Sequence, residues 1–66
     1  MSNASQAEKP RPLIRRQVRL ALAARDWTQA ELAGRINKSL TAVNLTINHN
    51  TYPDVAALIR AELNLP

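Results

Sequence analysis

The chain has no cysteine and only one histidine among its 66 residues. The absence of cysteine excludes a disulfide framework and a thiolate zinc site, and a single histidine cannot form a histidine-rich metal site. The few carboxylates show no pairing typical of acid–base catalysis. We therefore expect no metal, no cofactor, no small-molecule substrate and no enzymatic activity.

Long apolar runs are also absent. No stretch approaches the roughly 18 apolar residues that cross a bilayer, and the first residues do not resemble a secretory signal peptide. A cytosolic location without membrane association is therefore the expectation. A chain of this length has room for one domain, whose core is small because such a domain buries only roughly 60% of the surface of its unfolded chain.

Positive charge is the main excess of this composition. The formal net charge is +4 and the isoelectric point is near 10.8. Such a charge attracts polyanions, of which nucleic acid is the natural candidate, although anionic membrane surfaces attract the same residues. Five of the nine basic residues lie in one short stretch that is opposed there only by Glu8: Lys9, Arg11, Arg15, Arg16 and Arg19.

Residues 1–12 differ from the rest of the chain. They are polar, contain Pro10 and Pro12, and show no apolar period. This pattern predicts a disordered or extended basic N-terminal arm, followed by a single folded domain over residues 13–66.

The folded part is expected to begin with a helix over about 13–25. One apolar stripe at helical spacing supports this helix: Ile14, Val18, Ala21, Leu22 and Arg25. A second helix of about nine residues is expected from Thr28, where Thr28 and Glu31 have the spacing of a capping box. In that motif the hydroxyl accepts from the Glu31 amide, and the carboxylate reaches back to the Thr28 amide. Asn37 tolerates the left-handed conformation that ends a helix.

Two further helices follow. Ser39 can cap a third helix over 39–48, with Val43 and Ile47 on its inner face. Pro53 suits the first position of a fourth helix over about 53–63, whose apolar spacing predicts a buried stripe of Val55, Leu58, Ile59 and Leu63. No alternating strand pattern is present, so the predicted fold class is all-α, a compact arrangement of four helices.

The second and third helices suit a close crossing. A small residue at Ala33, a left-handed turn at Asn37 and a branched apolar residue at Val43 are what such a helix pair requires. The string TQAELAGRINKSLTAV over residues 28–43 resembles the helix-turn-helix of the lambda-repressor-like family, and the similarity extends over about 13–65. The resemblance implies a Cro- or repressor-type domain of phage or bacterial origin, located in the bacterial cytoplasm near the nucleoid.

The resemblance also implies which residues meet double-stranded DNA. Gln29 would contact a backbone phosphate, and the helix over 39–48 would lie in the major groove. The expected DNA-binding residues are Gln29, Lys38, Ser39, Leu40, Thr41, Asn44, Leu45 and Asn48. Further phosphate contacts are expected from Thr28, Arg35, Lys9 and Arg11.

Some residues depart from the family pattern. Lys38 and Thr46 stand where apolar residues are usual, which predicts weaker core packing there. Leu40 and Leu45 stand where polar or basic residues usually read base edges. Leucine offers no hydrogen bond to a base, so these two residues either contact thymine methyl groups or belong to a protein interface.

Two functional hypotheses follow from these observations. The first is a sequence-specific transcriptional regulator that binds duplex DNA as a homodimer, because one short helix reads few base pairs and a dimer reads two half-sites about 34 Å apart. The alternative is a helix-turn-helix module for protein interaction or assembly, such as a phage packaging component or an antitoxin-like protein, with DNA binding secondary. A third hypothesis is attachment to a membrane surface through the basic first helix. It is disfavoured because it would use the apolar stripe that the core requires.

Overall fold

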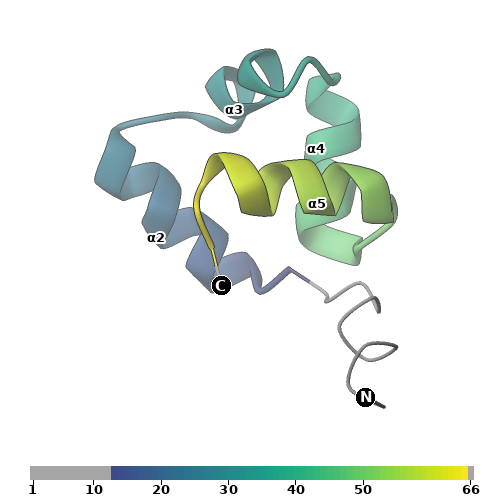
Figure 1. Ribbon diagram of the computed structural model, residues 1–66, viewed down its shortest axis with the longest axis horizontal. Coiled ribbons are helices and arrows are strands. Elements are labelled where there is room, and N and C mark those ends of the chain that lie inside the picture. Colours follow the sequence, from purple (N-terminus) through teal and green to yellow (C-terminus); the bar gives the residue numbers. More distant parts are fainter. Residues whose placement is uncertain (1–12, 66) are drawn as a thin grey trace, which may run out of the picture.

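The structure, a computed structural model, describes residues 13–65, which fold into four helices (Figure 1). Their bounds are Arg15–Arg25 for α2, Gln29–Arg35 for α3, Leu40–His49 for α4 and Pro53–Glu62 for α5. No strand occurs within this range, so the all-helical prediction is confirmed there. Helix α4 packs against each of the other three helices, which makes it the centre of the arrangement.

The start of α2 differs from the sequence expectation. Ile14 was expected on the buried stripe, but it is 55% exposed, and Leu13 is buried in its place. The reason is that Ile14 is the N-cap, with an extended backbone (φ −97°, ψ 111°), and so lies outside the helical period. The Leu13 amide donates to Asn50 Oδ1 at 2.8 Å, which holds this part of the chain at the end of α4.

The predicted N-caps of α3 and α4 are formed. Thr28 Oγ1 accepts from the Glu31 amide, and Ser39 Oγ accepts from the Ala42 amide, each at 3.1 Å. Only this half of the capping box matches the prediction, because the Glu31 carboxylate pairs with Arg35 Nε at 3.0 Å. Helix α3 has seven residues rather than nine, since it already ends at Arg35.

Left-handed residues follow all four helices. Asn37 has φ 60°, as predicted, and the same conformation occurs at Asp26, Asn50 and Asn64, with φ between 53° and 59°. Asparagine and aspartate adopt this region more easily than other side chains do. The only glycine, Gly34, lies inside α3, so each of these ends is formed without glycine.

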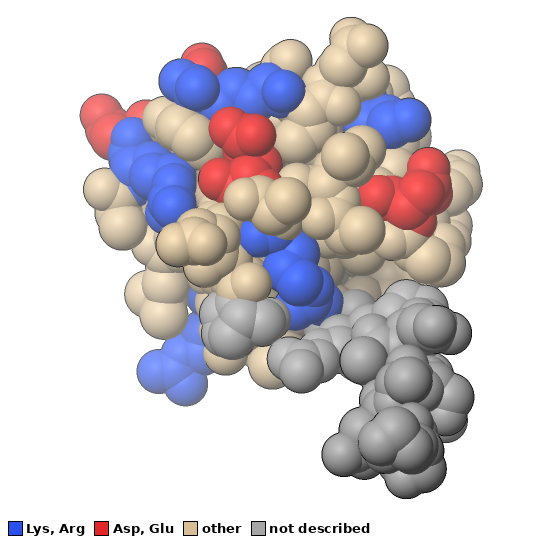
Figure 2. Space-filling view, viewed as in Figure 1, with Lys and Arg blue, Asp and Glu red and all other residues tan. Residues whose placement is uncertain are grey.

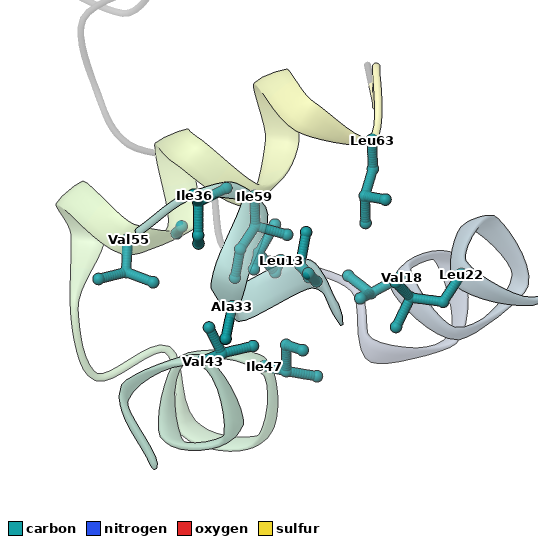
Figure 3. Packing of buried hydrophobic residues seen from close by; sticks show 12 residues of the cluster. Leu13, Val18, Leu22, Ala33, Ile36, Val43, Ile47, Val55, Ile59 and Leu63 are labelled. Carbon is teal, nitrogen blue, oxygen red and sulfur yellow. The ribbon is translucent and has the colours of Figure 1, made fainter. Parts of the chain in front are cut away.

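Side chains from every helix form the core, and they converge between the helices in Figure 3. The cluster consists of Leu13, Val18, Leu22, Leu32, Ala33, Ile36, Val43, Ile47, Val55, Ala56, Ile59 and Leu63. In α5 the expected stripe is wrong at one position, because Leu58 is 40% exposed and Ala56 is buried. Val55, Ile59 and Leu63 already fill the space facing the other helices, and the smaller Ala56 completes that face.

Thr46 is fully buried beside this cluster. Its hydroxyl donates to the Ala42 carbonyl at 2.7 Å, so the polar group has a partner inside α4. No buried side-chain nitrogen or oxygen atom in residues 13–65 lacks a hydrogen-bond partner. The buried Thr46 therefore leaves no unsatisfied polar group in the core.

Candidate nucleic-acid interface

The turn between α3 and α4 fixes how the two helices meet. The amides of Asn37 and Lys38 donate to the carbonyls of Gly34 and Ala33, at 3.3 and 2.9 Å. These bonds close the end of α3 before Ser39 starts α4. The small Ala33 and the branched Val43 are both buried, as a close crossing of the two helices requires.

A chain of side-chain hydrogen bonds runs over the surface of α4 and joins it to α2 and α3. Arg15 Nη1 donates to Asn48 Oδ1 at 3.3 Å, and Asn48 Nδ2 donates to Asn44 Oδ1 at 3.1 Å. Asn44 Nδ2 then donates to Gln29 Oε1 at 3.3 Å. We call these four residues the amide relay. It brings together three expected DNA-binding residues and one arginine of the basic stretch.

All bonds of the amide relay lie at the surface. Each amide therefore keeps hydrogen-bonding capacity for a ligand, because an Asn or Gln side chain has two N–H groups and an oxygen with two lone pairs. Gln29, at the receiving end, keeps both N–H groups of Nε2 outside the relay.

The charges around α4 also suit a polyanion. Residues Leu40–His49 include no Asp, Glu, Lys or Arg, and the exposed Arg15 and Lys38 flank them. On the face shown in Figure 2, by contrast, basic and acidic side chains are interspersed. The surface of α4 is thus an uncharged polar strip with cationic side chains beside it and no carboxylate of its own.

The remaining residues expected from α4 fall into two groups. Ser39, Leu40 and Thr41 are exposed at its N-terminal end, where Leu40 is 49% exposed. Leu45, by contrast, is half-buried, and its carbonyl accepts from Thr51 Oγ1 at 3.2 Å. Leu40 is therefore the more accessible of the two leucines.

Arg35 has neighbours that the sequence did not reveal. Its guanidinium lies 3.9 Å from the centre of the Trp27 ring and pairs with Glu31. The Arg25 guanidinium lies 5.6 Å from the same ring. Arg35, an expected phosphate contact, thus has an aromatic and an acidic neighbour within the chain. Thr28, another expected phosphate contact, is exposed and uses its hydroxyl as the N-cap of α3.

Comparisons with known proteins identify no relative of this chain. No family model, no curated protein and no solved structure matches this chain. Its interpretation therefore depends on the geometry of its own residues. Of the expected phosphate contacts, Lys9 and Arg11 lie outside the described residues.

Neither a metal site nor a membrane-spanning helix is present in the described part of the chain. The described residues include no group of three or more His, Cys, Asp or Glu side chains placed to hold a metal ion. Between residues 13 and 65 no helix is long and apolar enough to cross a membrane.

Proposed function

We propose that this chain binds duplex DNA sequence-specifically, with α3 and α4 acting as a helix-turn-helix of the lambda-repressor-like kind and α4 lying in the major groove. The observation that carries the proposal is the amide relay. It presents donors and acceptors along a strip of α4 that contains no carboxylate. Such groups read base edges, whereas a strip of carboxylates would repel phosphate.

The residues of the proposed interface, on α4 and beside it, have different roles. Gln29 and Lys38 hold backbone phosphates on the two sides of the turn, which sets the position of α4 on the duplex. Asn44 and Thr41 face base edges, and Leu40 contacts the methyl group of thymine. Asn48 supports Asn44 through the bond between their amides.

The proposed biological form is a homodimeric regulator of a phage or bacterium. Helix α4 has only ten residues, and one such helix reads too few base pairs to select a site in a genome. A twofold dimer reads two half-sites about 34 Å apart and removes this limit.

The test is binding of the full chain to labelled random-sequence duplex, measured by fluorescence anisotropy over a series of salt concentrations. We expect affinity to fall steeply as salt rises, because each phosphate neutralised by Lys or Arg releases condensed counterions. A flat salt response, or no binding at low salt, would contradict the proposal. Single-stranded DNA of the same length is the control for general attraction to a polyanion.

A protein-interaction or assembly module is the second candidate, and the exposure of Leu40 favours it. An apolar side chain at this place also suits contact with another protein. Leu40→Ala separates the two candidates. Reduced DNA discrimination with an unchanged sedimentation coefficient supports DNA contact, whereas dissociation of an oligomer in the absence of DNA supports a protein interface.

A further inference from the structure

We infer that the amide relay makes the site selective for A·T base pairs, and that Arg15 is a positioning residue that sets the orientation of Asn44. The inference rests on the proposed DNA binding and names the base pairs that it reads. It uses residues from three helices that lie side by side only in the folded chain.

The direction of the relay follows from the chemistry of its first member. A guanidinium only donates hydrogen bonds, so the side chain of Asn48 must turn its oxygen towards Arg15. Its Nδ2 then faces Asn44 and can bond only to the oxygen there. Rotating the side-chain amide of Asn48 or of Asn44 by 180° would place its NH₂ group opposite another N–H donor. Arg15 therefore orients Asn44 through Asn48.

With this orientation, Asn44 presents one remaining N–H group and one remaining lone pair. Adenine offers the complementary pair in the major groove, since N7 accepts and the N6 amino group donates. Guanine offers two acceptors there, N7 and O6, which Arg or Lys reads with two donors. Residues Leu40–His49 include neither Arg nor Lys, so α4 itself carries no side chain of this kind for guanine.

The neighbours of Asn44 on the exposed surface of α4 favour the same base pair. Leu40 and Thr41 are both exposed and carry methyl groups. Methyl groups contact the C5 methyl of thymine, which a G·C pair lacks. The strip thus combines a donor–acceptor pair for adenine with apolar groups for thymine.

The first measurement compares two labelled duplexes of equal length, one of alternating A·T and one of alternating G·C pairs. We expect the full chain to bind the A·T duplex about tenfold more tightly. The A·T duplex is then prepared with 7-deazaadenine, which removes N7 from the major groove and leaves the minor groove unchanged. The affinity should fall by about fivefold if Asn44 reads adenine there.

The second measurement tests the role of Arg15 with a matched pair of variants. Arg15→Met and Arg16→Met each remove one positive charge from an exposed position of α2, but only Arg15 belongs to the amide relay. Both variants should weaken binding to both duplexes through the lost charge. Only Arg15→Met should also reduce the ratio between the A·T and G·C affinities. Arg15→Lys should restore this ratio, because an ammonium group also donates to Asn48.

The possible failures differ from one another. Absence of binding to either duplex at low salt would overturn the proposed function and this inference with it. Equal affinity for the two duplexes, or no effect of 7-deazaadenine, would overturn the A·T selectivity and leave the proposed DNA binding in place. Equal ratios for Arg15→Met and Arg16→Met, with unchanged circular dichroism, would overturn the role of Arg15.

Discussion

Asn44 on α4 donates its side-chain amide to Gln29 on α3 at 3.3 Å. The side chain proposed to meet a base and the one proposed to hold a phosphate are therefore bonded to each other in the free protein. Each limits the rotamers of the other, so phosphate contact and base contact are coupled. Sequence reasoning had assigned the two residues separate roles without this bond.

A double-mutant cycle measures the coupling. Asn44→Ala should cost about 1 to 3 kcal/mol on the preferred duplex and little on random DNA, whereas Gln29→Ala should weaken both alike. Because the residues share a hydrogen bond, the effects of the two substitutions on the preferred duplex should deviate from additivity by at least about 0.5 kcal/mol. Strict additivity would show that the bond plays no part in the complex.

Lys38 should contribute to the salt dependence of binding. If it neutralises one phosphate, Lys38→Ala should lower the slope of log affinity against log salt by about one unit. Gln29→Ala is the matched control, because this residue is uncharged and its loss should leave the slope nearly constant. Equal slopes for Lys38→Ala and the unmodified chain would place Lys38 away from the phosphates.

Arg35 should matter more for stability than for binding. Removing its side chain loses the contact with the Trp27 ring and the ion pair with Glu31. We expect Arg35→Ala to lower the free energy of unfolding by about 1 kcal/mol. Urea unfolding followed by the fluorescence of the single tryptophan measures this directly. Lys38→Ala is the control, and an equally small effect of both variants would show that the contact with Trp27 contributes nothing.

Local signals in the sequence predicted local structure well. Thr28, Ser39 and Pro53 start helices where expected, because capping depends on a few neighbouring residues. Ile14 and Leu58 were misplaced because a repeating apolar pattern does not show where a helix begins or which of two adjacent apolar residues faces the core.

The candidate site was less predictable than the helices. The spacing of Asn44 and Asn48 places them on one face of a helix, so their contact was within reach of sequence reasoning. The bond between Arg15 and Asn48 joins residues 33 apart in the chain. It depends on how α2 crosses α4, which packing determines and no local pattern shows.

Two asparagines with the same backbone conformation allow a matched test of one hydrogen bond. Asn37 and Asn50 are both left-handed, but only the Asn50 side chain accepts from Leu13. Asn37→Gly and Asn50→Gly change the backbone preference alike, so this effect cancels in their difference. We expect Asn50→Gly to be less stable than Asn37→Gly by about 1 kcal/mol in urea unfolding. Equal stabilities would mean that the Leu13 bond adds nothing.

Gly34 offers a stabilising substitution. It lies within α3, and a Cβ atom there would meet nothing within 4 Å. Gly34→Ala should therefore raise the free energy of unfolding by about 1 kcal/mol, since alanine favours a helix more than glycine does. DNA affinity should not change. A loss of affinity with the stability gain intact would indicate that the duplex approaches the backbone at this residue.

The bond between Leu13 and Asn50 joins residues 37 apart in the chain, so it closes a loop that contains α2, α3 and α4. It is broken whenever the start of α2 and the end of α4 separate, even if each helix stays intact. The hydrogen-exchange rate of the Leu13 amide should therefore report on opening of the tertiary arrangement rather than on fraying of a single helix.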